Sequence, residues 1–232
     1  MVNIARKYVL LLLYLLAIPV IARAIPLKPS KPPLHNHNRN NSARLLPRTN
    51  ALLRDVTYYN KPSEDGTVSY QLLATRYKRW QNLARSDPQG FIQMVSKYSS
   101  VQLTPESIAY INNLQSMSEL TLQDGLQQSA LAMVLDEGPK GLFDHLNSQG
   151  QDPQARIASY GSYSWYGENL IAGHYNALDG IVVLINDVGV NDRGHRINIY
   201  SPKFDSVGIA CGPHTTYGIM CAFEFAADFV PK

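Results

Sequence analysis

The sequence predicts an α+β fold, with helices before and after a small antiparallel sheet. Apolar residues recur at helical spacing in several segments between residues 68 and 137 and again between 178 and 189. An aromatic, extended segment at 163–166 and a hairpin pattern at 207–223 supply the strands. With 232 residues, the chain can bury one sizeable core and carry an appended region.

Residues 1–24 have the pattern of a secretory signal peptide. Arg6 and Lys7 precede an apolar run over residues 8–21, and Ala-Arg-Ala at 22–24 forms a small-residue cleavage site. We expect cleavage after Ala24, secretion of the chain, and no stable membrane span afterwards. An uncleaved anchor is the alternative, but the run contains Pro19 and is shorter than the ~20 apolar residues that a spanning helix needs.

Residues 25–66 are rich in proline, asparagine and basic residues and have no apolar period, so we expect a disordered linker. Asn40 begins a glycosylation sequon, which matters only in a host that glycosylates. Residues 25–85 carry 11 basic and 3 acidic side chains, whereas residues 86–232 carry 7 and 15. An acidic globular part argues against nucleic acid as a partner.

Residues 67–103 are predicted to form a helical extension to the domain that follows. A helical stripe predicts its first helix over residues 68–84. Asp87-Pro88 and Thr104-Pro105 each combine an N-cap residue with proline at the first helical position, so each predicts a helix start. Another helix is expected from 122 to 137, ending at Gly138-Pro139. The stripe of the first helix consists of Leu73, Tyr77, Trp80 and Ala84.

The remaining elements lie between residues 152 and 223. Asp152-Pro153 predicts a short helix, and an apolar face over 178–185 predicts a longer one that ends near Gly189. Cys211 and Cys221 flank a turn-rich stretch between two apolar runs, which predicts a β-hairpin with the sulfurs on facing strands. In an exported chain, such a pair is more often a disulfide than two free thiols.

Four polar residues stand where core packing does not require them: His145, Glu168, Asp192 and His195. Asp192 and His195 are three residues apart and would share a face if that turn is helical. Convergence of all four would suit a divalent metal, with His145 and His195 as ligands of Zn²⁺. The same groups could instead transfer protons without a metal. Each alone is more often an ordinary hydrogen-bonding group.

Five motifs, taken together, resemble the CAP superfamily, whose SCP domain is shared by cysteine-rich secretory, antigen-5 and pathogenesis-related proteins. The resemblance runs from about Thr104 to residue 232, and the many disulfides of the animal proteins are missing, so the chain is most similar to the microbial branch. The motifs are Gly-Leu-Phe-Asp-His at 141–145, Gly-Glu-Asn-Leu at 167–170, Arg-Gly-His-Arg-Ile-Asn-Ile at 193–199, and the segments 202–214 and 217–221.

This resemblance implies an α/β/α sandwich with an antiparallel central sheet in residues 104–232. It also implies a cleft formed by His145, Glu168 and His195, with Asp192 at the position of the family's usual second glutamate. Two functions fit such a cleft. The first is an extracellular binding module for a metal ion, lipid or peptide, and the second is a metal- or histidine-dependent hydrolase of peptide or cell-wall material. The sequence does not separate them, and a cleft without function remains a third possibility.

Overall fold

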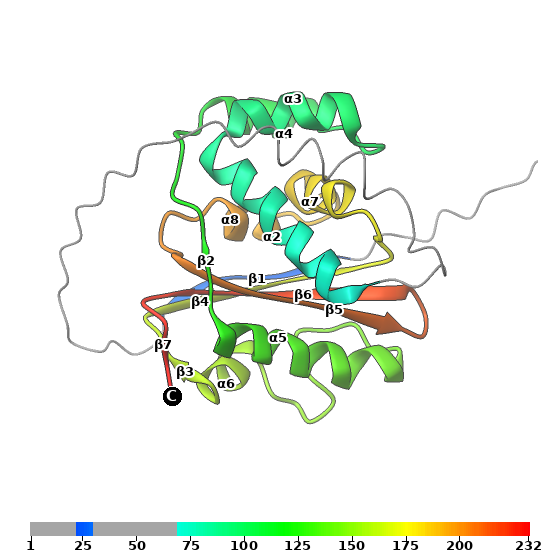
Figure 1. The fold of residues 1–232 in the computed structure, drawn as a ribbon, viewed down its shortest axis with the longest axis vertical. Helices are drawn as coiled ribbons and strands as arrows, with labels where there is room; N and C mark the ends of the chain where they lie inside the picture. Colours follow the sequence, from blue (N-terminus) through cyan, green and yellow to red (C-terminus); the bar gives the residue numbers. More distant parts are fainter. Residues whose placement is uncertain (1–21, 30–68) are drawn as a thin grey trace, which may run out of the picture.

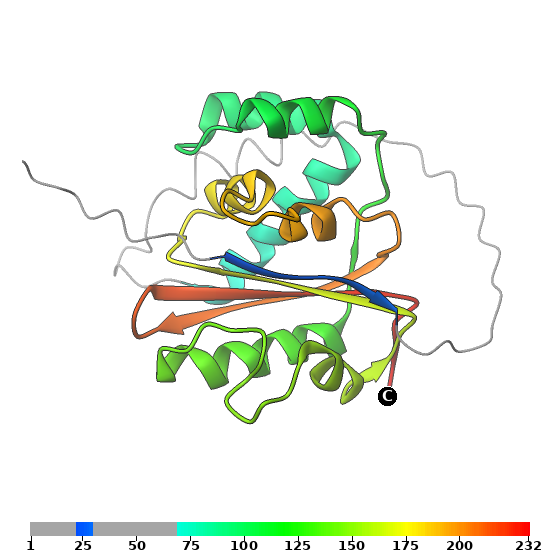
Figure 2. The ribbon, with the colours of Figure 1, turned by 180° about the vertical axis from the view of Figure 1, so that it is seen from behind.

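The structure is a computed structural model that describes residues 22–29 and 69–232. Its centre is a five-stranded sheet in the order β1-β4-β6-β5-β2. Every neighbouring pair is antiparallel except β2 and β5. Helices cover both faces (Figures 1 and 2), so the predicted α+β sandwich with an antiparallel central sheet is confirmed. The strands are β1 Ala22–Pro29, β2 Thr121–Leu122, β4 Trp165–Ala172, β5 Ser206–His214 and β6 Gly218–Ala227, with a separate pair, β3 Gly161–Ser162 and β7 Val230–Pro231.

The helices form two layers around this sheet. On one side lie α2, α7 and α8, with α3 and α4 farther out, and on the other side lie α5 and α6 (Figure 1). The positions predicted from the sequence agree with these elements to within a few residues. The helices are α2 Tyr70–Ser86, α3 Pro88–Tyr98, α4 Pro105–Asn112, α5 Asp124–Glu137, α6 Pro153–Ala158, α7 Ala177–Asn186 and α8 Gly194–Ile199, with a 3₁₀ turn, η1, at Gly138–Lys140.

The predicted helix starts have the expected capping bonds. The Asp87 carboxylate accepts a hydrogen bond from the Gly90 amide at 2.9 Å, and Thr104 Oγ1 accepts one from Ser107 at 3.1 Å. Asp152 caps α6 in the same way through Ala155. Each cap satisfies an amide that has no partner inside its helix, and the following proline has no amide to satisfy.

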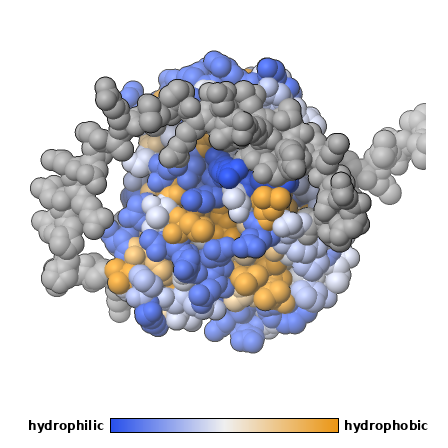
Figure 3. All heavy atoms as spheres, viewed as in Figure 1, coloured by the Kyte–Doolittle hydropathy of each residue, from blue (hydrophilic) through white to orange (hydrophobic). Residues whose placement is uncertain are grey.

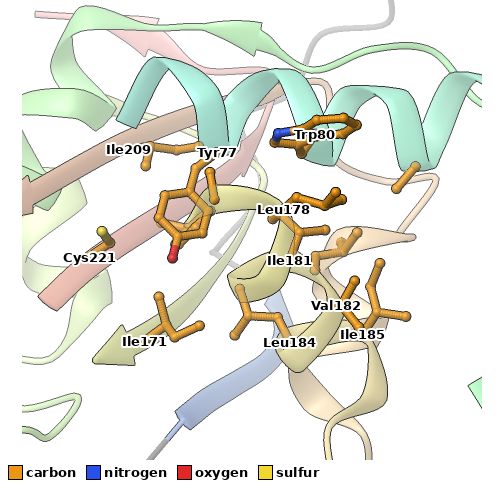
Figure 4. Packing of buried hydrophobic residues seen from close by; sticks show 14 of the residues in the cluster. Tyr77, Trp80, Ile171, Leu178, Ile181, Val182, Leu184, Ile185, Ile209 and Cys221 are labelled. Carbon is orange, nitrogen blue, oxygen red and sulfur yellow. The ribbon is translucent and has the colours of Figure 1, made fainter. Parts of the chain in front are cut away.

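Helix α2 is part of the main core and not an extension outside it. Tyr77 and Trp80 point from α2 toward α7 and the sheet (Figure 4), and the Tyr77 ring meets Phe223 edge-on at 5.2 Å between centroids. The buried Arg85 guanidinium donates to the carbonyl oxygens of Ile199 and Ser201, both at 2.8 Å. Residues on both sides of Thr104 therefore belong to one hydrophobic cluster.

The β5–β6 hairpin confirms the predicted disulfide. Cys211 and Cys221 are directly opposite each other in the register and are bonded. Both side chains are buried in the main core. His214 at the end of β5 is also buried: its Nδ1 accepts hydrogen bonds from the amides of Thr216 and Tyr217 and closes the turn.

Strand β1 differs from the sequence prediction. Residues 22–24 were expected at the end of the signal peptide and residues 25–29 in the linker, yet all eight form a strand along the edge of β4. An extended segment can pair with an exposed edge through backbone groups alone, and such pairing leaves little trace in an apolar pattern. The apolar run over 8–21, the rest of the linker and Asn40 lie outside the described residues.

On the face shown in Figure 3, hydrophobic areas are separate and surrounded by hydrophilic residues. Among the residues that the structure describes, no helix is long and apolar enough to span a bilayer.

Candidate functional site

The loop that carries His145 is held at both ends. It leaves η1 through Gly141, whose positive φ of 67° suits glycine, and Phe143 packs edge-on against the ring of Tyr217 at 5.9 Å. At the other end Arg156, on α6, donates from Nη1 to the His145 carbonyl oxygen at 2.8 Å and to that of Gln151 at 3.0 Å. His145 is therefore positioned by its backbone as well as by its ring.

Glu168 lies in the middle of β4 and is fully buried. Its Oε1 is 2.6 Å from Nδ1 of His145, and its Oε2 accepts a hydrogen bond from Nη2 of Arg156. Burial raises the pKa of Glu168 to about 7, against the opposing effect of Arg156. The glutamate thus joins the loop of His145 to α6.

Glu224 is a second buried carboxyl group in the same cluster. It lies directly opposite Glu168 on β6, so both side chains are on the face covered by α5 and α6. Ser129 on α5 donates to it at 3.2 Å, and Arg156 lies 3.5 Å from it. Burial, and then the charge of Glu168, raise the pKa of Glu224 well above its usual value. Two buried carboxyl groups therefore share one guanidinium, an arrangement that favours a proton on one of them.

The other histidine, His195, lies in the first turn of α8 and is fully buried. Its Nδ1 is 2.5 Å from Oδ1 of Asp187, and its backbone amide donates to Oδ2 of the same carboxylate at 2.9 Å. Asp187 ends α7 in the left-handed conformation, φ 52° and ψ 40°, which turns its side chain toward α8. The carboxylate partner of His195 is thus Asp187.

Asp192 is separate from this group. It is exposed, and its carboxylate accepts from the Gly194 amide at 3.2 Å. Arg193, between Asp192 and the first residue of α8, has a positive φ of 54°, so the helix starts only after it. The expectation that Asp192 and His195 share a helical face therefore does not hold, because Asp192 precedes the helix.

Asn169 connects the two halves of the site through the sheet. Neighbouring residues of a strand point to opposite faces, so Glu168 faces α5 and α6 while Asn169 faces α8. The Asn169 amide donates to the His195 carbonyl oxygen at 3.1 Å, and Asn198 donates to Asn169 Oδ1 at 2.8 Å. The Glu-Asn pair thus holds His145 from one face of β4 and the turn of His195 from the other.

The two imidazoles also interact electrostatically. Burial, followed by the electrostatic effect of His195, lowers the pKa of His145 to about 4. His145 is therefore neutral at neutral pH, and when its Nδ1–H donates to Glu168, its Nε2 carries the free lone pair. The Nε2 atoms of His145 and His195 are both buried without a hydrogen-bond partner among the residues described.

Only part of this arrangement fits a metal site. A carboxylate on Nδ1 and an unpartnered Nε2 is the arrangement of a metal-bound histidine and its supporting acid, and both histidines have it. Zinc sites usually contain at least three protein ligands. Within residues 22–29 and 69–232, no group of three or more His, Cys, Asp or Glu is arranged to hold a metal. The side chains supply two imidazole ligands, and Zn²⁺ binding stays a prediction.

A family model described as the cysteine-rich secretory protein family, CAP, matches residues 84–223, which include every residue of this site except Glu224. The chain belongs to this family. The match starts inside α2 and thus includes residues that precede Thr104. This agrees with the burial of α2 in the main core.

Individual relatives of this CAP protein are distant. It is 28% identical over 116 residues to an uncharacterized protein, YkwD, of Bacillus subtilis, covering 48% of this chain and 43% of the relative. The chain therefore matches less than half of that relative's length. Two solved structures are similar. An outer surface protein of Borrelia burgdorferi has a TM-score of 0.42 at 19% identity, covering 48% of this chain and 79% of that one. An extracellular SCP-domain protein of Bacillus anthracis has a TM-score of 0.41 at 18% identity, covering 56% and 45%.

The structure places His145, Glu168 and His195 beside three residues that the sequence analysis did not single out. These three residues are Asp187 at the end of α7, Arg156 on α6 and Glu224 on β6. The sequence predicted the three elements but gave no functional role to these residues. The alternation of β6 offered one signal: Glu224 is a charged residue between Phe223 and Phe225, in an otherwise apolar strand. A charge at such a position requires a buried partner.

Proposed function

We propose that this CAP protein is an extracellular binding module whose ligand is held by the Nε2 atoms of His145 and His195. The observation that carries the proposal is that both atoms are buried and unpartnered while both Nδ1 atoms are fixed by carboxylates. A buried polar atom without a partner costs free energy that a bound ligand recovers. Extracellular location is supported by the predicted signal peptide, the disulfide and the family's description as secretory.

The ligand must offer a hydrogen-bond donor or a cation to two nitrogen lone pairs. A divalent metal such as Zn²⁺, or an N–H or O–H group of a peptide or lipid, meets this requirement. The carboxylates behind the imidazoles fix the orientation of each ring. Burial keeps His145 uncharged at neutral pH, so the ligand meets a neutral imidazole at this position.

A hydrolase is the second candidate, and the same pair favours it. Neutral His145, with Nδ1 fixed by Glu168 and Nε2 free, has the arrangement of a general base that takes a proton from water. A metal bound at the two Nε2 atoms would lower the pKa of such a water. In such an enzyme, Glu168 and Asp187 would hold the two imidazoles in one orientation, and burial would keep His145 uncharged.

Calorimetric titration of the exported chain with Zn²⁺ tests the metal-binding form of this proposal. We expect saturable binding that is weakened at least tenfold in both His145→Ala and His195→Ala. His174→Ala is the matched control, since His174 lies in the loop between β4 and α7 and also has an unpartnered Nε2. Binding that is equally affected by all three variants would reject a site shared by His145 and His195.

A second measurement separates the binding module from the hydrolase. Peptide and glycan substrates are incubated with the wild-type chain, with and without chelator, and with His145→Ala. Turnover that disappears in the variant supports the enzyme, whereas saturable binding without turnover supports the module.

A further inference from the structure

Strand β1 occupies the outer edge of β4 beside the candidate site. Ala22, Arg23 and Ala24 pair with Ile171, Leu170 and Asn169, and Ile25 lies opposite Glu168. Figures 1 and 2 show β1 running along β4 under α8, and β1 also contacts α8. The edge that β1 covers therefore runs directly past the two residues that hold His145 and His195.

The pairing of β1 is weakened in its second half. The register is irregular between Ile25 and Lys28, where Pro26 lies, and the strand ends at Pro29. Proline has no amide hydrogen to donate to a ladder. The regular part of the ladder is thus the segment Ala22–Ile25.

Signal-peptide cleavage after Ala24 would remove most of that regular part. The exported chain would begin at Ile25 and lose the partners of Asn169, Leu170 and Ile171. Leu170 and Ile171 are buried side chains in the interior of β4, and β6 pairs with only one side of the strand. Cleavage would leave an open row of backbone donors and acceptors in a strand that is otherwise well fixed.

We propose that this edge of β4, Asn169–Ile171, binds an extended peptide by antiparallel strand addition in the exported protein. The inference names a peptide as the ligand of the site proposed above. It depends on that proposal only for a contact between the peptide and the two histidines. Backbone pairing at a sheet edge supplies affinity, while side chains at alternate positions supply selectivity. The same backbone pairing is made by residues 22–24 in the chain before cleavage.

Two features indicate the chemistry of the peptide: the sequence of residues 22–24, which cover this edge before cleavage, and the charge of the domain. Residues 22–24 are Ala-Arg-Ala, with small residues at alternate positions and a basic residue between them. Residues 86–232 carry 15 acidic and 7 basic side chains, which favours a basic partner. We infer a basic peptide with small residues at every second position.

Fluorescence anisotropy with the exported chain and a labelled synthetic peptide of sequence Ala22–Pro29 tests the inference. The N-terminus of the exported chain is first determined by sequencing. We expect saturable binding, and at least tenfold weaker binding of the same peptide N-methylated at alternate residues, which keeps the side chains and removes ladder donors. Uncleaved chain, in which the edge is already occupied, is expected to bind at least tenfold more weakly.

Hydrogen exchange locates the binding. Amides of Asn169–Ile171 that do not bond to β6 should exchange quickly in the exported chain and slow at least tenfold when peptide is added. The inference is overturned if the peptide and its N-methylated form bind alike, if these amides do not respond, or if the exported chain begins at or before Ala22. Zn²⁺ titration of the wild-type exported chain separates the two proposals. Peptide binding without Zn²⁺ binding would count against the metal-binding form of the histidine site alone, and Zn²⁺ binding without peptide binding would overturn this inference alone.

Discussion

Glu168 and Asn169 are neighbours in β4 whose side chains hold opposite faces of the sheet, one through the His145 ring at 2.6 Å and the other through the His195 carbonyl oxygen at 3.1 Å. A single strand thereby fixes two histidines that are 50 positions apart in the chain.

Replacing Asn169 by alanine should loosen α8 more than it disturbs the sheet. The change removes the donor to His195 and the acceptor of Asn198, both buried. We expect a loss of roughly 1–3 kcal/mol in the free energy of unfolding, measured by urea denaturation. Asn113→Ala is the control: its amide bonds only to the carbonyl oxygen of Ala109 on an exposed helix end, so its cost should be below about 0.5 kcal/mol. Equal losses would contradict the assigned role of Asn169.

Arg156→Met should be strongly destabilising at pH 7 and less so at pH 5. The substitution leaves Glu168 and Glu224 buried without their cation, a change that costs roughly 3–5 kcal/mol in comparable cases. The pKa of Glu168 is raised to about 7, so acid neutralises the orphaned carboxyl groups. The double variant Arg156→Met with Glu224→Gln should recover part of the loss. Lys140→Met, which breaks an exposed pair with Asp136, should cost less than about 1 kcal/mol.

The titration of His145 should be shifted to acid pH. Its pKa, lowered to about 4 by burial and by His195, should be visible in NMR spectra of the imidazole ring, and His195→Ala should move it upward. Below pH 6.5 the unfolded chain takes up a proton at this residue while the folded chain does not until about pH 4. The contribution to stability is thus present above pH 6.5 and lost as the pH falls toward 4, by up to ~3 kcal/mol. A ring that titrates near 6.5 would contradict this electrostatic assignment.

Gly180→Ala should separate α7 from α2. A Cβ atom at this position would lie 2.2 Å from the Tyr77 hydroxyl oxygen and 2.6 Å from a ring carbon. We expect a loss of roughly 1–3 kcal/mol in thermal or urea unfolding. Tyr77→Phe alone removes a hydrogen bond to the His174 carbonyl oxygen, but in the Gly180→Ala background it also relieves the shorter contact. The losses in free energy of unfolding of the two single variants should therefore add up to more than the loss measured for the double variant.

Local patterns in the sequence predicted most elements and three members of the site. Caps at Asp87, Thr104 and Asp152, and the turn between Cys211 and Cys221, depend on bonds within a few residues, so short segments define them. The motifs around His145, Glu168 and His195 indicated the family because of their order and spacing. The assignment of Asp192 failed for a local reason as well, since the left-handed backbone at Arg193 delays the start of α8.

Tertiary structure alone decided which acids contact the histidines. Asp187 pairs with His195 because α7 ends in a left-handed residue that faces α8, and Glu224 joins Glu168 because β6 lies beside β4 in that register. The strand Ala22–Pro29 joins the sheet through backbone groups that every residue except proline provides in full. Sequence by itself determined the helices, the hairpin, its disulfide and the two histidines, because each depends on nearby residues or on residue type. Pairings between distant segments depend on the packed chain.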